Sequence, residues 1–258
     1  MRRRARRSST AQVFSVILIR YTVATHRLTF GFYMKKLVLA PHPDDETIGL
    51  GGTIAKAASN GDDVVVCVIT GHGEQPHPLF KRDRMQLTRD DCKKACDIMG
   101  VSELMFTNLP TTLLDMTPIY QINKVIDDVV KQVQPDELYI PFTGDLHKDH
   151  GSIAYAAMVS TRPYLDIGKT VKRVLAYETL SETHLDAPYF NTSFQPNYFV
   201  DISDFLDTKV EAMGQYHLQL KEGAHPRSLA SLRALAHLRG SHIGVDAAEA
   251  FVLIRESA

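Results

Sequence analysis

A regular alternation of short apolar runs and amphipathic segments from Met34 onward constrains the fold more than any other feature. The run 64–69 is continuously apolar and rich in β-branched residues, as in strands buried on both faces of a sheet. Segment 118–133 instead places apolar side chains at helical spacing. Strands that alternate with helices form right-handed βαβ units. The sequence therefore predicts an α/β fold with a Rossmann-like, doubly wound, mainly parallel sheet flanked by helices.

The same patterns locate the individual elements. Strands are predicted at 37–40, 64–69, 103–107, 137–140, 171–177, 198–202 and 250–254. Helices are predicted at 48–58, 82–99, 118–133, 152–160, 205–220 and 228–239. In a doubly wound sheet the first four strands take the order 3-2-1-4. No internal repeat or linker interrupts 34–258, which we interpret as one domain.

The first 33 residues differ in composition from the rest. They carry seven arginines and no acidic residue, with a short apolar run that Arg20 interrupts. This run is shorter than the roughly 20 residues that span a bilayer, and no small-residue cleavage site follows it. Because Met34 begins a normal opening strand, residues 1–33 are predicted to be a basic extension, loosely attached or upstream of the true start.

Charge and cysteine content narrow the partners and the compartment. Residues 34–258 hold 22 basic and 30 acidic side chains, which gives no reason to expect nucleic acid as a partner. Three cysteines are too few for a disulfide framework and favour a reducing, cytoplasmic compartment. Cys92 and Cys96 lie four residues apart on a predicted helix, a spacing that could seat a metal, but a buried structural role is favoured.

The strongest local signal is the segment PHPDDE at 41–46, between the first predicted strand and the first helix. Its two prolines stiffen the turn, and the helix N-terminus that follows favours carboxylates. Asp44 or Asp45 could simply cap that helix, but one cap needs only one residue. Four metal-competent groups within five residues therefore indicate a functional site.

A second cluster, HKDH at 147–150, follows the fourth predicted strand. His147 and His150 are three residues apart and share a face of a helical turn, and Asp149 can hydrogen-bond one imidazole. HKDH by itself could be a solvated loop. In the order 3-2-1-4, however, strands one and four are neighbours, so both clusters lie in the crevice where such sheets bind ligands.

Together the clusters supply the groups of a hydrolytic metal site. Two imidazoles and one carboxylate with open positions are common ligands of catalytic zinc, although iron or cobalt accepts similar ones. Zinc lowers the pKa of bound water to roughly 7 and polarises a carbonyl. A further carboxylate can act as general base, and a further histidine as acid or oxyanion stabiliser. The inventory predicts metal-assisted hydrolysis of an amide or ester.

These motifs resemble the PIG-L/LmbE-like family of zinc-dependent N-acetylglucosaminyl deacetylases, which carry (A/P)HPDDE after a strand and a later HxDH. The likeness covers roughly residues 34–255. It includes Arg89 and Asp91 ahead of an Ile-Met-Gly helix end, the stretch from Lys209 to Gln219, and a closing RGS…AEAF. It implies an enzyme that binds one zinc and removes the N-acetyl group from an amino sugar or its conjugate.

The resemblance also implies a role for each site residue. The zinc ligands would be His42, Asp45 and His150. Asp44 would be the general base acting on zinc-bound water. His147 would stabilise the oxyanion or protonate the leaving amine, and Asp149 would orient His147. Weaker candidates for substrate binding are Arg89, His217 and Arg227. Lys148, where relatives often have proline, is a departure without an interpretation.

Two other functions stay open on the sequence. One is a zinc amidase or deacylase acting on another N-acyl compound, such as a thiol-sugar conjugate. The other is a sugar- or nucleotide-binding α/β protein without catalysis. The glycine-rich segment 49–52 could cradle a phosphate, but it lacks the full dinucleotide spacing, and close helix packing is favoured. The identity of the sugar and its carrier, and the formation of a homo-oligomer, are left open.

Overall fold

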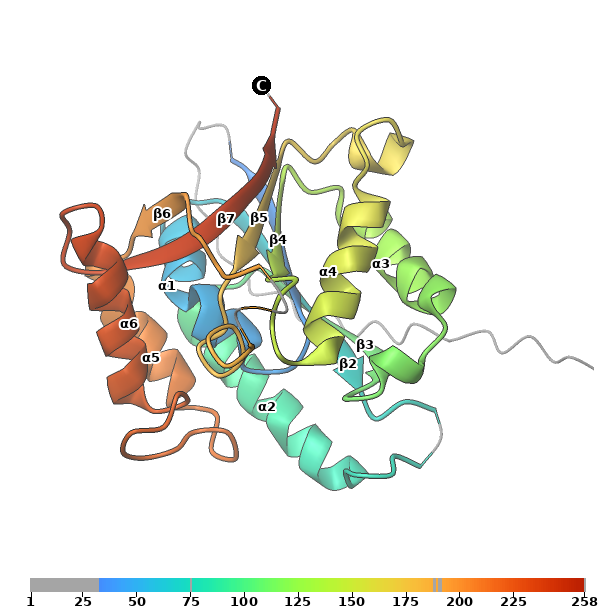
Figure 1. Cartoon of the computed structure of the whole chain (residues 1–258), viewed down its shortest axis with the longest axis horizontal. Helices are drawn as coiled ribbons and strands as arrows, with labels where there is room; N and C mark the ends of the chain where they lie inside the picture. Colours follow the sequence, from blue (N-terminus) through green and yellow to red (C-terminus); the bar gives the residue numbers. More distant parts are fainter. Residues whose placement is uncertain (1–32, 75, 188, 190–191, 258) are drawn as a thin grey trace, which may run out of the picture.

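Seven strands form one sheet with helices on both faces (Figure 1). This arrangement comes from a computed structural model, which describes residues 33–257 apart from 75, 188, 190 and 191. The strands are β1 (Lys35–Ala40), β2 (Asp63–Gly71), β3 (Glu103–Pro110), β4 (Glu137–Pro141), β5 (Arg173–Tyr177), β6 (Tyr198–Asp201) and β7 (Ala248–Glu256). The helices are α1 (Asp45–Ser59), α2 (Arg82–Met99), α3 (Ile119–Val133), α4 (Lys148–Ser160), α5 (Leu206–Met213) and α6 (Leu229–Ser241).

The sheet order is β3-β2-β1-β4-β5-β7-β6, which contains the predicted 3-2-1-4 core. Neighbouring strands are parallel from β3 through β2, β1 and β4 to β5, whereas β7 runs antiparallel to both β5 and β6. Because β1 lies between β2 and β4, the loops that leave β1 and β4 emerge side by side. The predicted α/β fold is confirmed.

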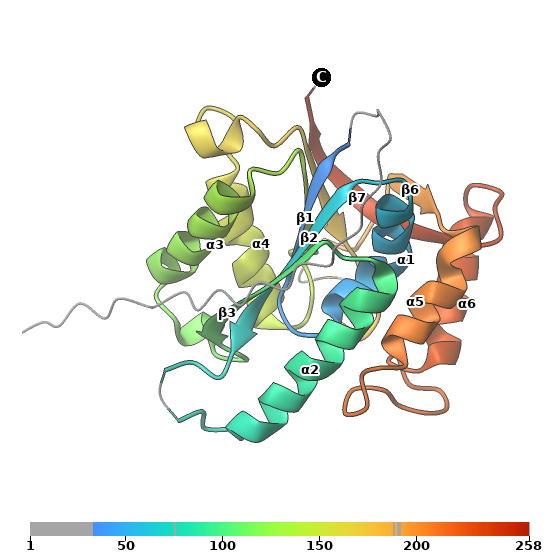
Figure 2. The same ribbon diagram turned by 180° about the vertical axis from the view of Figure 1, so that it is seen from behind.

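The two faces of the sheet bury separate apolar clusters. Leu37 and Leu39 of β1 pack with α3 and α4 on one face. Val38 and Ala40 point the other way, toward α1, α2, α5 and α6. Figures 1 and 2 show these two helical layers from opposite sides. Because both clusters pack against β1, this strand is held rigidly, and so is the start of the loop that follows it.

One helix is much shorter than its sequence pattern predicts. The predicted helix 205–220 ends at Met213, and the chain continues through Gly214 into turns. Tyr216 then turns into the core and is fully buried. His217, expected on this helix, therefore lies in the turn after it. A tertiary contact of Tyr216 thus overrides the local helical periodicity.

The glycines of segment 49–52 serve close packing of α1. A Cβ on Gly49 would lie 2.4 Å from Tyr177 Cδ2, and one on Gly52 would lie 2.6 Å from Ile202 Cδ1. These contacts leave no room for a side chain at either position. Cys67, Cys92 and Cys96 are buried free thiols.

The basic extension predicted for 1–33 falls almost entirely outside the described residues and stays a prediction. Within the described part of the chain, no helix combines the length and the apolarity needed to cross a bilayer.

Candidate active site

The turn after β1 holds its polar side chains in a fixed arrangement. The Pro41 carbonyl accepts hydrogen bonds from the backbone N–H and the hydroxyl of Thr70 on β2. Asp45 opens α1, and its Oδ2 accepts the His42 backbone N–H at 2.9 Å. Asp44 takes φ 117° and ψ −25°, a conformation that favours glycine and costs a non-glycine residue on the order of 1–3 kcal/mol. The Asp44 side chain makes no capping hydrogen bond, so capping does not explain this residue.

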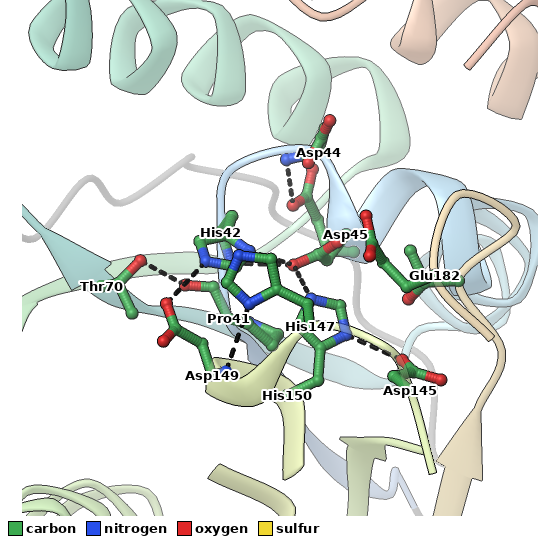
Figure 3. Close-up of polar contacts among 12 residues, drawn as sticks. Pro41, His42, Asp44, Asp45, Thr70, Asp145, His147, Asp149, His150 and Glu182 are labelled. Carbon is green, nitrogen blue, oxygen red and sulfur yellow. Dashed lines mark hydrogen bonds and ion pairs between the residues drawn. The ribbon is translucent and has the colours of Figure 1, made fainter. Parts of the chain in front are cut away.

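His42, Asp45 and His150 meet around one carboxylate oxygen (Figure 3). Asp45 Oδ2 lies 3.2 Å from His42 Nδ1 and 3.2 Å from His150 Nε2. The ring nitrogens of His42, His147 and His150 also lie within 4.8 Å of one another. Among the described residues, the buried atoms Asp45 Oδ1 and His150 Nε2 have no hydrogen-bond partner. Imidazole nitrogens and carboxylate oxygens in this arrangement fit a divalent transition metal.

In the trio His42, Asp45 and His150, each imidazole also contacts a second carboxylate through its other ring nitrogen. His150 Nδ1 contacts Asp145 Oδ2 at 2.7 Å, and Asp145 also accepts the Thr183 hydroxyl. His42 Nε2 contacts Asp149 Oδ2 at 2.9 Å. Such contacts fix the tautomer and orientation of an imidazole and make its free nitrogen a better metal ligand. No role in the site was predicted for Asp145, which lies between β4 and His150.

The contacts of Asp149 differ from the predicted ones. Its carboxylate was expected to orient His147 but instead bonds His42 and the backbone N–H groups of Thr112 and Leu114. His147 precedes α4 as its N-cap, and its Nδ1 accepts the backbone N–H of Asp149. Asp149 lies in the first turn of α4, which begins at Lys148. Its carboxylate is therefore directed toward His42 after β1 and toward Thr112 and Leu114 after β3, and not toward His147.

Paired charges dominate the protonation of the trio. Burial by itself lowers the pKa of His42, but hydrogen bonds to Asp149 and Asp45 raise it to about 9. Burial likewise opposes the charge on His150, whereas Asp45 and Asp145 raise its pKa to about 10. Burial would raise the pKa of Asp45, but the charge of His150 holds it well below the usual value. The cluster is thus built to surround positive charge.

Asp44 and His147 are shifted the other way. Asp44 is only 2 % exposed, and burial raises its pKa to about 8 against the opposing charge of Arg227. Its Oδ2 has no hydrogen-bond partner among the described residues and lies 3.4 Å from Arg227 Nε. Burial, and then the charge of His42, lower the pKa of His147 to about 4. His147 is therefore a neutral imidazole near pH 7.

A cavity of about 400 Å³ opens beside this cluster. His42, Asp44 and His147 form part of its wall. The N-terminal half of α2 forms another part, with Arg84, Met85, Thr88 and Arg89. The remaining wall includes three residues from the last third of the chain, namely Glu182, Gln219 and Arg227. No sequence motif marks Glu182, whereas Gln219 closes the family-like stretch that begins at Lys209. Only the folding of two distant loops brings both residues to the cavity.

The three weaker substrate-binding candidates fall in different places. Arg89 lines the cavity, where its guanidinium donates to the Thr107 carbonyl at 2.6 Å. Arg227 also lines it, 3.6 Å from Glu182 Oε1. The His217 side chain is 69 % exposed, contacts Asp91 and is not among the described residues that line the cavity.

Fold and site together define a Rossmann-like α/β protein with a histidine–carboxylate cluster at the carboxyl edge of its sheet. Residues 37–161 match the family described as PIG-L, GlcNAc-PI de-N-acetylase. The diacetylchitobiose deacetylase of Thermococcus kodakarensis is 27% identical over 223 residues, which are 85% of this chain and 83% of that relative. Residues 37–161 of the chain thus carry a PIG-L family domain.

Two solved structures share the fold. An N,N'-diacetylchitobiose deacetylase from Pyrococcus horikoshii, in complex with its inhibitor, superimposes with a TM-score of 0.69 at 24% identity, covering 86% of this chain and 84% of that one. GalB, the 4-carboxy-2-hydroxymuconate hydratase of Pseudomonas putida, superimposes with a TM-score of 0.67 at 20% identity, covering 87% and 98%. Because this fold is found with two different reactions, the activity has to be argued from the site.

Proposed function

We propose that the protein is a metal-dependent hydrolase that removes the N-acetyl group from an N-acetylated amino sugar or its conjugate. One observation carries the proposal: beside the cavity, Asp45 Oδ1 is buried without a hydrogen-bond partner among the described residues, and His150 Nε2 has only the Asp45 carboxylate, at 3.2 Å, to contact. Buried polar atoms are normally paired, so an unsatisfied carboxylate oxygen beside imidazole nitrogens suits a bound cation. The relative named diacetylchitobiose deacetylase supports the choice of substrate class.

His42, Asp45 and His150 would hold the cation, and zinc is the metal that these donor types favour. When bound, the metal acidifies a water molecule and polarises the acetamide carbonyl. Two of the three are shielded from solvent, since His150 is fully buried and Asp45 is 1 % exposed. Protons would leave His42 and His150 on loading, because a metal binds the neutral imidazole.

Asp44 is the proposed general base. Its Oδ2 accepts no hydrogen bond among the described residues and belongs to a residue of the cavity wall, so it can accept a proton from the attacking water. A general base works best when its pKa lies near the operating pH, and burial raises the pKa of Asp44 to about 8. The same oxygen can then deliver the proton to the departing amine nitrogen.

His147 is the proposed oxyanion stabiliser. Its Nδ1 accepts the Asp149 backbone N–H, so the neutral ring carries its proton on Nε2. An Nε2–H can donate to the oxygen that gains charge when water adds to the carbonyl. Protonation of the leaving amine suits His147 less well, because its pKa is lowered to about 4.

The cavity supports a small polar substrate. Its volume of about 400 Å³ falls within the range of ligand pockets, roughly 300–1,000 Å³. Arg89, Arg227 and Glu182 supply charged hydrogen-bonding groups around it. Such groups suit the hydroxyls and the linking oxygens of a sugar.

Incubation with a panel of N-acetylhexosamine derivatives tests the proposal. The zinc-loaded protein should release acetate and free amine in equal amounts from at least one of them. Compounds with longer acyl chains separate a deacetylase from a broader amidase. Saturable sugar binding without amine release would instead identify a binding protein and overturn the proposal.

A further inference from the structure

The backbone of Asp44 needs a restraint to stay where it is. With φ 117°, this aspartate occupies a region that side chains other than glycine rarely adopt. Strained residues of this kind persist only where their surroundings over-determine them. The residues that restrain Asp44 therefore decide where its carboxylate points.

Glu46 provides the contact to the Asp44 backbone. Its Oε2 accepts the Asp44 N–H at 3.1 Å, and its Oε1 accepts the Thr47 hydroxyl at 2.7 Å. The Glu46 side chain is fully buried, so no solvent can replace these partners. Since its two oxygens are both engaged, Glu46 cannot swing away without losing hydrogen bonds on each side.

Tyr216 holds Glu46 from a distant part of the chain. Its hydroxyl donates a short hydrogen bond to Glu46 Oε1, and its ring is fully buried in the cluster between α1, α2 and α5. Tyr216 lies in the turns that replace the predicted end of α5, in the same loop region that carries Arg227 to the Asp44 carboxylate. This loop thus reaches the Asp44 backbone indirectly, through Glu46, and the Asp44 carboxylate directly, through Arg227.

The buried thiols nearby do not make this cluster a second metal site. Glu46, Cys92 and Cys96 place donor atoms within 4.8 Å of one another. Yet Glu46 already has three hydrogen-bond donors, and all three residues are shielded from solvent. Burial raises the pKa of Cys92, and a hydrogen bond to Cys92 together with burial raises that of Cys96. Both thiols are therefore protonated in the cluster as it stands.

We propose that Glu46 and Tyr216 are positioning residues that hold the Asp44 backbone in its left-handed conformation and thereby aim its carboxylate at the reacting water. The inference rests on the proposed role of Asp44 as general base. Neither residue lines the cavity among the described residues, so each acts through Asp44 rather than on the substrate.

Tyr216→Phe tests the inference, because it removes one hydroxyl and keeps the ring. We expect kcat to fall by about 10- to 100-fold, as for a reacting group displaced by about 1 Å, with KM and zinc content within about twofold of wild type. Tyr139→Phe is the matched control. It removes a hydroxyl that donates to buried Glu137 at 3.1 Å, outside the cavity lining, and should leave kcat unchanged.

A second variant tests whether the two residues act along one chain. Glu46→Ala should lower kcat at least as far, and adding Tyr216→Phe to it should change kcat by less than about twofold. Independent, multiplicative losses would contradict the inference, and so would a Tyr216→Phe enzyme with wild-type kcat. If Glu46→Ala does not fold, the comparison of Tyr216→Phe with Tyr139→Phe still tests the inference.

The Asp44 conformation can be checked without turnover. A crystal structure of Tyr216→Phe should show Asp44 with φ moved out of the positive range or with its carboxylate redirected. An unchanged Asp44 would overturn the proposal even if activity fell. Because this measurement needs no substrate, failure of the proposed deacetylase activity and failure of the positioning role can be told apart.

Discussion

At Asp44 and Asp45, adjacent carboxylates acquire opposite properties from their contacts. Asp45 faces two imidazoles, and its pKa lies well below the usual value. Asp44 faces a cavity with one arginine, Arg227, 3.4 Å from its Oδ2, and burial raises its pKa to about 8. One is therefore suited to bind a cation and the other to exchange a proton.

This difference predicts two separable variants. His150→Ala should abolish tight zinc binding, because it removes one of three ligands. Asp44→Asn should keep one zinc per chain and lower kcat by about 100- to 10,000-fold, since it removes only the base. Elemental analysis and acetate release measure the two effects. Full activity in Asp44→Asn would show that the base is another group.

Asp145 offers a test of the support behind a ligand. Asp145→Ala removes the carboxylate that contacts His150 Nδ1 at 2.7 Å. We expect zinc affinity to fall by about 10- to 100-fold, because without this carboxylate the His150 imidazole is less basic and less well oriented. Competition with a chromophoric chelator measures the affinity. Asp128→Ala, on the exposed surface of α3 beside Lys124, is the control and should leave it unchanged.

At the scale of elements, α1 is two helical segments joined at Leu50, where φ and ψ leave the helical range. Glu249 of β7 accepts the backbone N–H groups of Gly52 and Thr53 and also the ammonium of Lys209 on α5. The second segment of α1 is thus capped by a strand near the end of the chain. This contact fixes the second segment of the helix whose first segment begins at Asp45.

Gly52→Ala tests the packing of this second segment. The new Cβ would lie 2.6 Å from Ile202 Cδ1 and 2.9 Å from Ile202 Cβ, so α1 and the chain at Ile202 must move apart. We expect the free energy of unfolding to fall by about 1–3 kcal/mol, measured by urea denaturation. Zinc stoichiometry should be retained, because no ligand contact is touched. An unchanged stability would mean that this contact relaxes freely.

At the scale of the whole molecule, the site draws on both halves of the chain. The family match ends at residue 161, and the proposed ligands and base all precede that point. Glu182, Tyr216 and Arg227, which complete the cavity or contact the Asp44 region, come afterwards. The last third also supplies β5, which pairs with β4 in the middle of the sheet.

A fragment of residues 34–161 should therefore not fold cooperatively. It would expose the edge of β4 and lose Tyr177, Tyr216 and Phe251 from the core on one face. Circular dichroism should show no sigmoidal thermal transition, and zinc-dependent acetate release should be absent. A cooperative transition in this fragment would show that the first half is an independent domain.

The sequence by itself determined the α/β fold and the position of both polar clusters. Buried β-branched runs and helical periodicity are local signals, and the doubly wound topology then places the loops after β1 and β4 together. The contiguous motifs at 41–46 and 147–150 could therefore be recognised without coordinates.

Only the tertiary structure decided which contacts each group makes. The partner of Asp149, the end of α5 at Met213 and the places of Glu182 and Tyr216 depend on residues up to 170 positions apart. No local pattern encodes such pairs, because burial and hydrogen bonding select them when the chain closes on itself. The same closure sets the pKa of Asp44, which depends first on solvent exclusion and then on the charge of Arg227, 183 positions along the chain.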